Sequence, residues 1–145
     1  MRHRMAAAVL ALCGVLVSTY LLLYKLGVIG SMMCGAANEC ERVQASRYSV
    51  FLGLPVAAYG VGGYLVLLGI ALWGLREDQV ARPMATRWLA GLSGLGVAFS
   101  LYLLYLELFV IHAICRWCSV SGVVILAICI VSVAGLVRFS RAPAP

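Results

Sequence analysis

Charged residues divide the chain into four long apolar runs. No Asp, Glu, Lys or Arg interrupts residues 5–24, 48–75, 88–106 and 117–137. A helix needs about 20 apolar residues to cross roughly 30 Å of hydrocarbon, so each run predicts a membrane-spanning helix. Helix is expected because lipid offers no partner to a free backbone N–H or C=O group. The second run is too long for one straight crossing, and Pro55 divides it into an interfacial piece (48–54) and the crossing itself.

The pattern predicts an all-α integral membrane protein that forms one domain, residues 1–145. We expect a four-helix bundle with spans at about 5–27, 55–75, 88–110 and 115–137. A loop at residues 28–54, containing a short interfacial helix, would lie over the outer end of this bundle.

Composition agrees with a membrane location. Hydrophobic residues make up 64% of the 145 positions and charged residues only 11%, which excludes a water-soluble domain, a disordered chain and a nucleic-acid-binding protein. The net charge of +6 reflects 11 Lys and Arg residues scattered between the spans. Seven of them fall on the side that holds both termini and four on the other, which predicts cytoplasmic termini.

The six cysteines fall into two groups under this topology. Cys13 and Cys129 lie inside spans, where we expect small packing residues. The other four lie on the outer side, where an oxidising compartment preserves disulfides. These are Cys34, Cys40, Cys115 and Cys118.

The Cys-x-x-Cys motif at 115–118 opens the fourth span. Three-residue spacing puts both sulfurs on one helix face, and the free N–H groups of a helix N-terminus stabilise a thiolate. A thiolate is the species that attacks a disulfide or an electron-poor ring. Two cysteine pairs, one on a loop and one at the level of the lipid headgroups, suggest an electron relay from a soluble thiol to a membrane quinone.

Two other interpretations remain open from the residues alone. All four outer cysteines could form a zinc site, although the spacing of Cys34 and Cys40 is loose for that metal. The chain could also be a structural tetraspan whose disulfides only staple its loops. We expect the redox function and no metal.

A longer pattern surrounds the cysteines. Cys34 and Cys40 are followed by Glu-Arg-Val-Gln-Ala-Ser46-Arg47-Tyr48, then by Phe51-Leu-Gly-Leu-Pro55 and, near the fourth span, by the Cys-x-x-Cys motif. Together with the four-span layout, this pattern resembles the vitamin K epoxide reductase family. The Gly-Leu-Pro-Val stretch is more typical of its bacterial members. Some of those members carry a fused thioredoxin-like domain; we expect the single-domain form here.

The resemblance implies an enzyme, a quinone-dependent thiol–disulfide oxidoreductase that forms disulfide bonds. It would reoxidise a periplasmic thioredoxin-fold thiol oxidase and reduce a membrane quinone. This quinone would be menaquinone, which has a ring of the vitamin K type, or ubiquinone. The implied location is the bacterial cytoplasmic membrane, with the active cysteines facing the periplasm or the cell exterior. The outer loop would then cap a quinone pocket.

The resemblance also implies roles for the four cysteines. Cys118 would lie beside the quinone and donate electrons to its ring. Cys115 would resolve Cys118 and accept a disulfide from Cys40. Cys34 would pair with Cys40 and exchange with the soluble partner.

Five further residues are candidates for the site. By resemblance, Ser46 stabilises the segment over the quinone, and its position also predicts a helix cap for the segment that starts at residue 47. Phe51 belongs to the matching stretch, and Gly122 lies one turn after Cys118, where it leaves room for a ring or for helix packing. Glu107 and His112 are candidates for proton relay, with solvated interfacial side chains as the alternative.

The sequence also departs from the vertebrate members. Their Thr-Tyr-Ala triplet is replaced by Ser121-Gly122-Val123, and the only asparagine is Asn38, in the first loop. The resemblance therefore does not predict vitamin K epoxide as the substrate.

Overall fold

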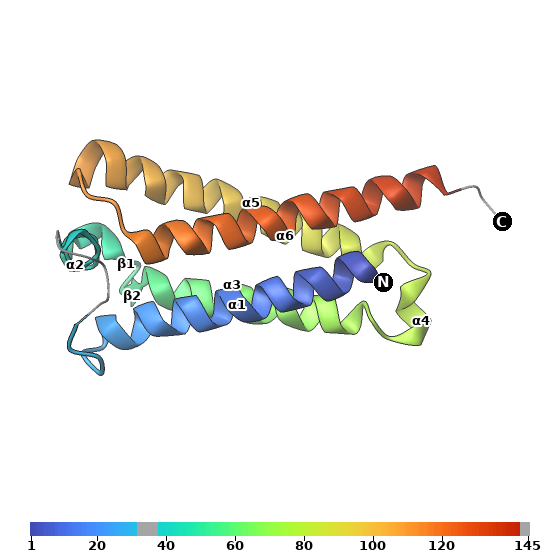
Figure 1. Ribbon diagram of the computed structural model, residues 1–145, viewed down its shortest axis with the longest axis horizontal. Helices are drawn as coiled ribbons and strands as arrows, with labels where there is room; N and C mark the ends of the chain where they lie inside the picture. Colours follow the sequence, from blue (N-terminus) through green and yellow to red (C-terminus); the bar gives the residue numbers. More distant parts are fainter. Residues whose placement is uncertain (32–37, 143–145) are drawn as a thin grey trace.

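The computed structural model describes residues 1–31 and 38–142 (Figure 1). Four helical segments are long and apolar enough to cross a membrane, so the predicted four-helix membrane fold is confirmed. The third continues without a break into a π-helical turn, η2. The four segments are α1 (Arg2–Lys25), α3 (Val56–Trp73), α5 with η2 (Met84–Leu106 and Glu107–Ile111) and α6 (Arg116–Arg141).

Short elements cover the two ends of the bundle. One end, which we call the cysteine end, holds α2 (Glu39–Ala45), the 3-10 turn η1 (Arg47–Ser49), a two-stranded antiparallel sheet and the start of α6 (Figure 1). The sheet pairs β1 (Val50–Phe51) with β2 (Leu54–Pro55). The other end, the terminal end, holds both chain termini and the short helix α4 (Glu77–Val80).

The segment expected to form an interfacial piece at 48–54 contains most of this hairpin. Its two-residue loop, Leu52 and Gly53, has positive φ at both positions (51° and 81°), as a type I′ turn requires. The short helix of the outer loop lies earlier, at α2. Pro55 is the N-cap of α3, where its lack of an N–H group costs no helical hydrogen bond.

The long helices pack in the order α3, α1, α6, α5, and the fourth side, where α3 faces α5, is packed least closely. Close approach of α1 and α3 depends on Gly14, because a Cβ there would lie 2.3 Å from the Tyr64 ring. Apolar side chains also cover the outer faces of the helices, as expected for contact with lipid. Examples are Val9, Leu16, Leu95 and Val123.

At the terminal end, the buried side chain of Arg4 links helices through hydrogen bonds. Arg4 is only 1% exposed, and its guanidinium donates to the carbonyls of Gly74, Gln79 (2.9 Å) and Arg82 (2.5 Å). It also donates to the Thr86 hydroxyl at 3.1 Å. The first turn of α1 is thereby joined to the connection between α3 and α5.

Candidate active site

The Cys-x-x-Cys motif lies at the N-terminus of α6, as predicted. Cys115 is the N-cap residue with extended backbone angles, and its sulfur accepts the backbone N–H of Cys118 at 3.3 Å. The two side chains have different surroundings. Cys115 is 0% exposed, whereas Cys118 is half-buried and lines a cavity in the bundle.

Cys40 approaches this motif from α2. It is 0% exposed and belongs to the same buried cluster as Cys115, together with Leu21, Val43 and Ala113. Cys40 is disulfide-bonded, whereas Cys115 and Cys118 have free thiols. Cys34, the fourth predicted site cysteine, lies outside the described residues.

The cysteines expected to be packing residues lie away from this cluster. Cys13 in α1 and Cys129 in α6 both have free thiols, and neither lines the cavity. Cys13 is exposed on the outer surface of the bundle, so it is a lipid-facing residue and not a core one.

Hydrogen bonds lower the pKa of Cys115 below its ordinary value. The largest contribution is a hydrogen bond from the Cys118 thiol, and the backbone N–H groups of Cys118 and Trp117 act in the same direction. Burial and the nearby charge of Glu107 oppose this shift. Within the reduced pair, Cys115 is therefore the thiol that these hydrogen bonds favour for loss of a proton.

Glu107 is part of this arrangement. Its side chain is buried (5% exposed), its Oε2 atom accepts the backbone N–H of Cys115 at 3.2 Å, and its carboxyl group also interacts with Cys118. Glu107 is the first residue of the π-helical turn η2, and its carbonyl accepts the N–H of Ala113 at 3.1 Å. π-Helical turns are frequent at functional sites because they redirect side chains from the regular helical register.

His112, the other candidate for proton relay, lies elsewhere. It adopts a left-handed conformation (φ 54°) that ends the π-helical turn, and its side chain is exposed. It does not line the cavity. The structure thus brings Glu107, but not His112, to the cysteine pair.

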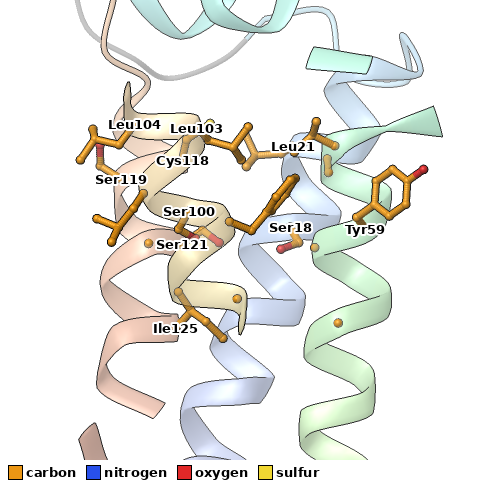
Figure 2. A pocket seen from close by; sticks show the side chains of 18 of the residues that line it. Ser18, Leu21, Tyr59, Ser100, Leu103, Leu104, Cys118, Ser119, Ser121 and Ile125 are labelled. Carbon is orange, nitrogen blue, oxygen red and sulfur yellow. The ribbon is translucent and has the colours of Figure 1, made fainter. Parts of the chain in front are cut away.

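The cavity extends from Cys118 into the bundle and has a volume of about 970 Å³. Figure 2 places Cys118 and Ser119 near its upper end, Ser121 below them and Ile125 deeper in the bundle. Its wall is mainly apolar and is contributed by α1, α3, α5, α6 and the segment from α2 to β1. The predicted residues Ser46, Phe51, Glu107 and Gly122 all line it.

Ser46 differs in detail from its expected role as a helix cap. It occupies the N-cap position of η1, but its hydroxyl makes no capping bond there. The hydroxyl instead donates to the Val43 carbonyl at 2.7 Å, at the C-terminal end of α2. The Ser46 carbonyl accepts the Ser49 N–H at 3.1 Å and lies 2.8 Å from the Ser49 hydroxyl. Ser46 therefore stabilises the junction of α2 and η1 above the cavity.

Two site residues gave no signal in the sequence. Gln44 lines the cavity, and its Nε2 donates to the Cys118 sulfur at 3.8 Å. Lys25, at the end of α1, donates to the Gln44 carbonyl (2.5 Å) and to the Ser49 hydroxyl (2.6 Å). Only the tertiary fold brings Gln44 and Lys25 to the site, so neither their spacing in the sequence nor their residue type identifies them.

Tyr64 on α3 closes the cavity toward the core. Its hydroxyl donates to the Ser121 carbonyl at 2.7 Å and lies 3.0 Å from the Ser121 hydroxyl on α6. Ser121 is the first residue of the triplet that departs from the vertebrate pattern. The two helices are thus joined by hydrogen bonds one turn below Cys118.

Comparison with known families identifies the fold. The family model described as "Vitamin K epoxide reductase family" matches residues 5–133 of the 145-residue chain. The chain belongs to the vitamin K epoxide reductase family.

Family membership defines the general activity. Proteins of this family are membrane oxidoreductases that exchange thiols and disulfides, use quinone and work with thioredoxin-like partners. The match includes α2, the Cys-x-x-Cys motif and the four predicted spans nearly to the end of α6. The cavity beside Cys118 is therefore the candidate quinone site of this family member.

Proposed function

We propose that this protein forms disulfide bonds by passing electrons from a thioredoxin-fold partner through Cys34 and Cys40, then Cys115 and Cys118, to a membrane quinone. The observation that carries the proposal is the different environment of the two cysteines at the start of α6. Cys118 lines the cavity, whereas Cys115 packs in the buried cluster that contains Cys40. Each member of the pair therefore has its own reaction partner.

The relay consists of two thiol–disulfide exchanges and one electron transfer. The partner's dithiol reduces the disulfide between Cys34 and Cys40, and the partner becomes oxidised. The Cys40 thiolate then attacks the Cys115 sulfur of the Cys115–Cys118 disulfide, which releases Cys118 as a thiolate. The attack of Cys34 on Cys40 restores the outer disulfide and leaves the pair on α6 reduced. This final state has the same redox pattern as the structure, in which Cys40 is disulfide-bonded and the α6 pair is free.

The last step reduces the quinone. The thiols of Cys115 and Cys118 lose two electrons and two protons and form a disulfide, and the quinone gains both to become a quinol. The cavity fits such a substrate because its volume is within the range of small-molecule sites, about 300–1,000 Å³, and its walls are mainly apolar with a few polar groups beside Cys118. A ring with an isoprenoid tail has the same distribution of polar and apolar atoms.

Glu107 is the proposed proton carrier. Cys115 does not line the cavity, so its proton needs a route to the quinone. The Glu107 carboxyl group contacts the Cys115 backbone, interacts with the Cys118 side chain and lines the cavity. It is therefore suited to accept a proton from the thiol pair and to release it on the quinone side.

The proposed location follows the distribution of basic residues. The terminal end would face the cytoplasm and the cysteine end the periplasm of a bacterial cytoplasmic membrane. This orientation exposes α2 and the outer loop to a soluble thiol oxidase.

Single cysteine variants test the proposal. With purified protein in detergent, a small dithiol as reductant and a short-chain quinone as acceptor, Cys118→Ala is expected to abolish quinone reduction. Cys34→Ala should retain activity with the small dithiol but lose it with a thioredoxin-fold protein as reductant. Cys13→Ala and Cys129→Ala are matched controls, because both residues are cysteines in spans away from the cavity. Equal activity of all the single variants would refute the relay.

A further inference from the structure

Hydrogen-bond donors near Cys118 are scarce. Five of the nine hydroxyl groups that line the cavity already donate to backbone carbonyls; the other four are those of Ser18, Tyr48, Ser100 and Ser121. A hydroxyl has only one hydrogen to donate, so the five committed groups have none left for a ligand unless they rearrange. The committed hydroxyls are those of Ser46, Ser49, Tyr59, Tyr64 and Ser119.

Gln44 differs from these hydroxyls because its side-chain amide carries two N–H groups. One of these N–H groups donates to the Cys118 sulfur, with Nε2 and Sγ 3.8 Å apart. The residue is 7% exposed and lines the cavity. The chain has three side-chain amides, and the other two lie elsewhere, Asn38 before α2 and Gln79 at the terminal end. Within the described residues, Gln44 is thus the only amide on the cavity wall.

The backbone of Gln44 is held in place from two elements. Its carbonyl accepts hydrogen bonds from the Lys25 ammonium group on α1 (2.5 Å) and from the Ser49 hydroxyl in η1 (2.7 Å). Bonds from an ionised donor are stronger than neutral ones. The amide is therefore presented from the end of α2 on a fixed backbone, as a preorganised group at a binding site requires.

We propose that Gln44 holds the Cys118 sulfur with one amide N–H and binds a carbonyl oxygen of the quinone with the other. This assignment rests on the proposed function and adds a quinone-binding residue to it. A single planar amide would then fix the distance and orientation between the sulfur that donates electrons and the ring that accepts them. The amide gives up no proton. Its bond to the carbonyl strengthens as negative charge develops on that oxygen, so it favours electron transfer as well as binding.

Gln44→Met tests the assignment, because methionine has an unbranched side chain of similar length and no hydrogen to donate. With a small dithiol and a short-chain quinone, we expect kcat/KM for the quinone to fall roughly 10- to 100-fold, as two hydrogen bonds are lost. KM for the quinone should rise and kcat should fall, while KM for the dithiol stays unchanged. Gln79→Met makes the same substitution in α4, far from the cavity, and should match the wild type.

Gln44→Asn separates binding from packing. It keeps both N–H groups on a chain shorter by one methylene, so it should retain more activity than Gln44→Met. Wild-type kinetics in Gln44→Met would overturn the assignment. Equal losses in the Met and Asn variants, each accompanied by a lower melting temperature, would also overturn it, because Gln44 would then act through packing alone. If the wild-type protein itself reduces no quinone, the proposed function fails and the role of Gln44 fails with it.

Discussion

Glu107 offers a way to separate proton transfer from structural support within one side chain. Its Oε2 accepts the N–H of Cys115 at 3.2 Å, and both residues are buried. Glu107→Leu removes this acceptor and leaves a buried N–H without its partner, at a cost of about 1–3 kcal/mol. Glu107→Gln keeps an acceptor oxygen in the same place. It weakens the bond only by the difference between a charged and a neutral acceptor, about 1 kcal/mol.

The two variants should therefore differ in stability but show a similar loss of quinone-reduction rate. Neither can accept a proton from the thiol pair. General acid–base groups contribute about 10²- to 10⁴-fold, so we expect kcat for quinone reduction to fall at least about 100-fold in both. For a chain of this size, 1 kcal/mol corresponds to roughly 2–4 °C, so Glu107→Leu should melt several degrees lower than Glu107→Gln.

The assay is steady-state quinone reduction by a small dithiol, combined with thermal melting of the same preparations in detergent. Cys129→Ala, a substitution in α6 away from the cavity, is the control for effects of handling the variants. The proton-carrier role is refuted if Glu107→Gln turns over at the wild-type rate. Loss of activity in the leucine variant alone would leave Glu107 with a purely structural role as the acceptor for the Cys115 N–H.

Three further predictions concern the cavity, the thiol pair and the terminal end. A Cβ on Gly63 or Gly69 meets no protein atom within 4 Å, but of these two glycines only Gly63 lines the cavity. Gly63→Leu should therefore occupy part of the quinone site and raise KM for the quinone about tenfold or more, whereas Gly69→Leu should leave KM unchanged. Thiolate absorbance of a variant that retains only the pair on α6 should titrate at a lower pH than an ordinary cysteine thiol, because hydrogen bonds from Cys118 lower the pKa of Cys115, and Cys118→Ala should move the transition upward. Because the pKa of Cys115 is lowered in the folded state, ionisation of Cys115 stabilises the folded protein. This contribution is fully present above the pKa of the unfolded thiol and is lost as the pH falls through the folded-state pKa. Arg4→Met should lower the melting temperature by several degrees and leave KM for the quinone unchanged, because it removes four hydrogen bonds at the end of the bundle remote from the cavity.

The four helices were predictable because lipid imposes a simple rule. A run of about 20 apolar residues between charged positions must form a helix, and all four such runs do so. The ends of the helices were less predictable. Arg4 lies within α1 although it is charged, because backbone carbonyls and Thr86 satisfy its guanidinium. Nothing in the local sequence indicates that these carbonyls lie there, since they belong to residues 70 or more positions away.

The site was partly predictable for a related reason. Cysteines and a carboxylate between apolar runs are conspicuous, so Cys115, Cys118 and Glu107 could be selected by residue type. Gln44 and Lys25 are ordinary residues near the C-terminal ends of α2 and α1. Their importance depends on the fold of α2 over the cavity, which brings Gln44 to a cysteine 74 positions later in the chain.

The local geometry of α6 also corrects the simplest interpretation of its motif. Three-residue spacing suggests two sulfurs on one helix face, but Cys115 is the N-cap and has extended backbone angles. An N-cap side chain bends back to the first free N–H groups of the helix, and the Cys115 sulfur accepts the N–H of Cys118 in this way. Cys118, one turn into the helix, lines the cavity. The same cap therefore stabilises a thiolate on Cys115, keeps the two sulfurs close enough to form a disulfide, and gives each a different neighbour. This arrangement suits a relay between a soluble thiol and a membrane quinone, because Cys115 is buried within the cluster that contains Cys40, whereas Cys118 packs at the edge of that cluster and also lines the cavity.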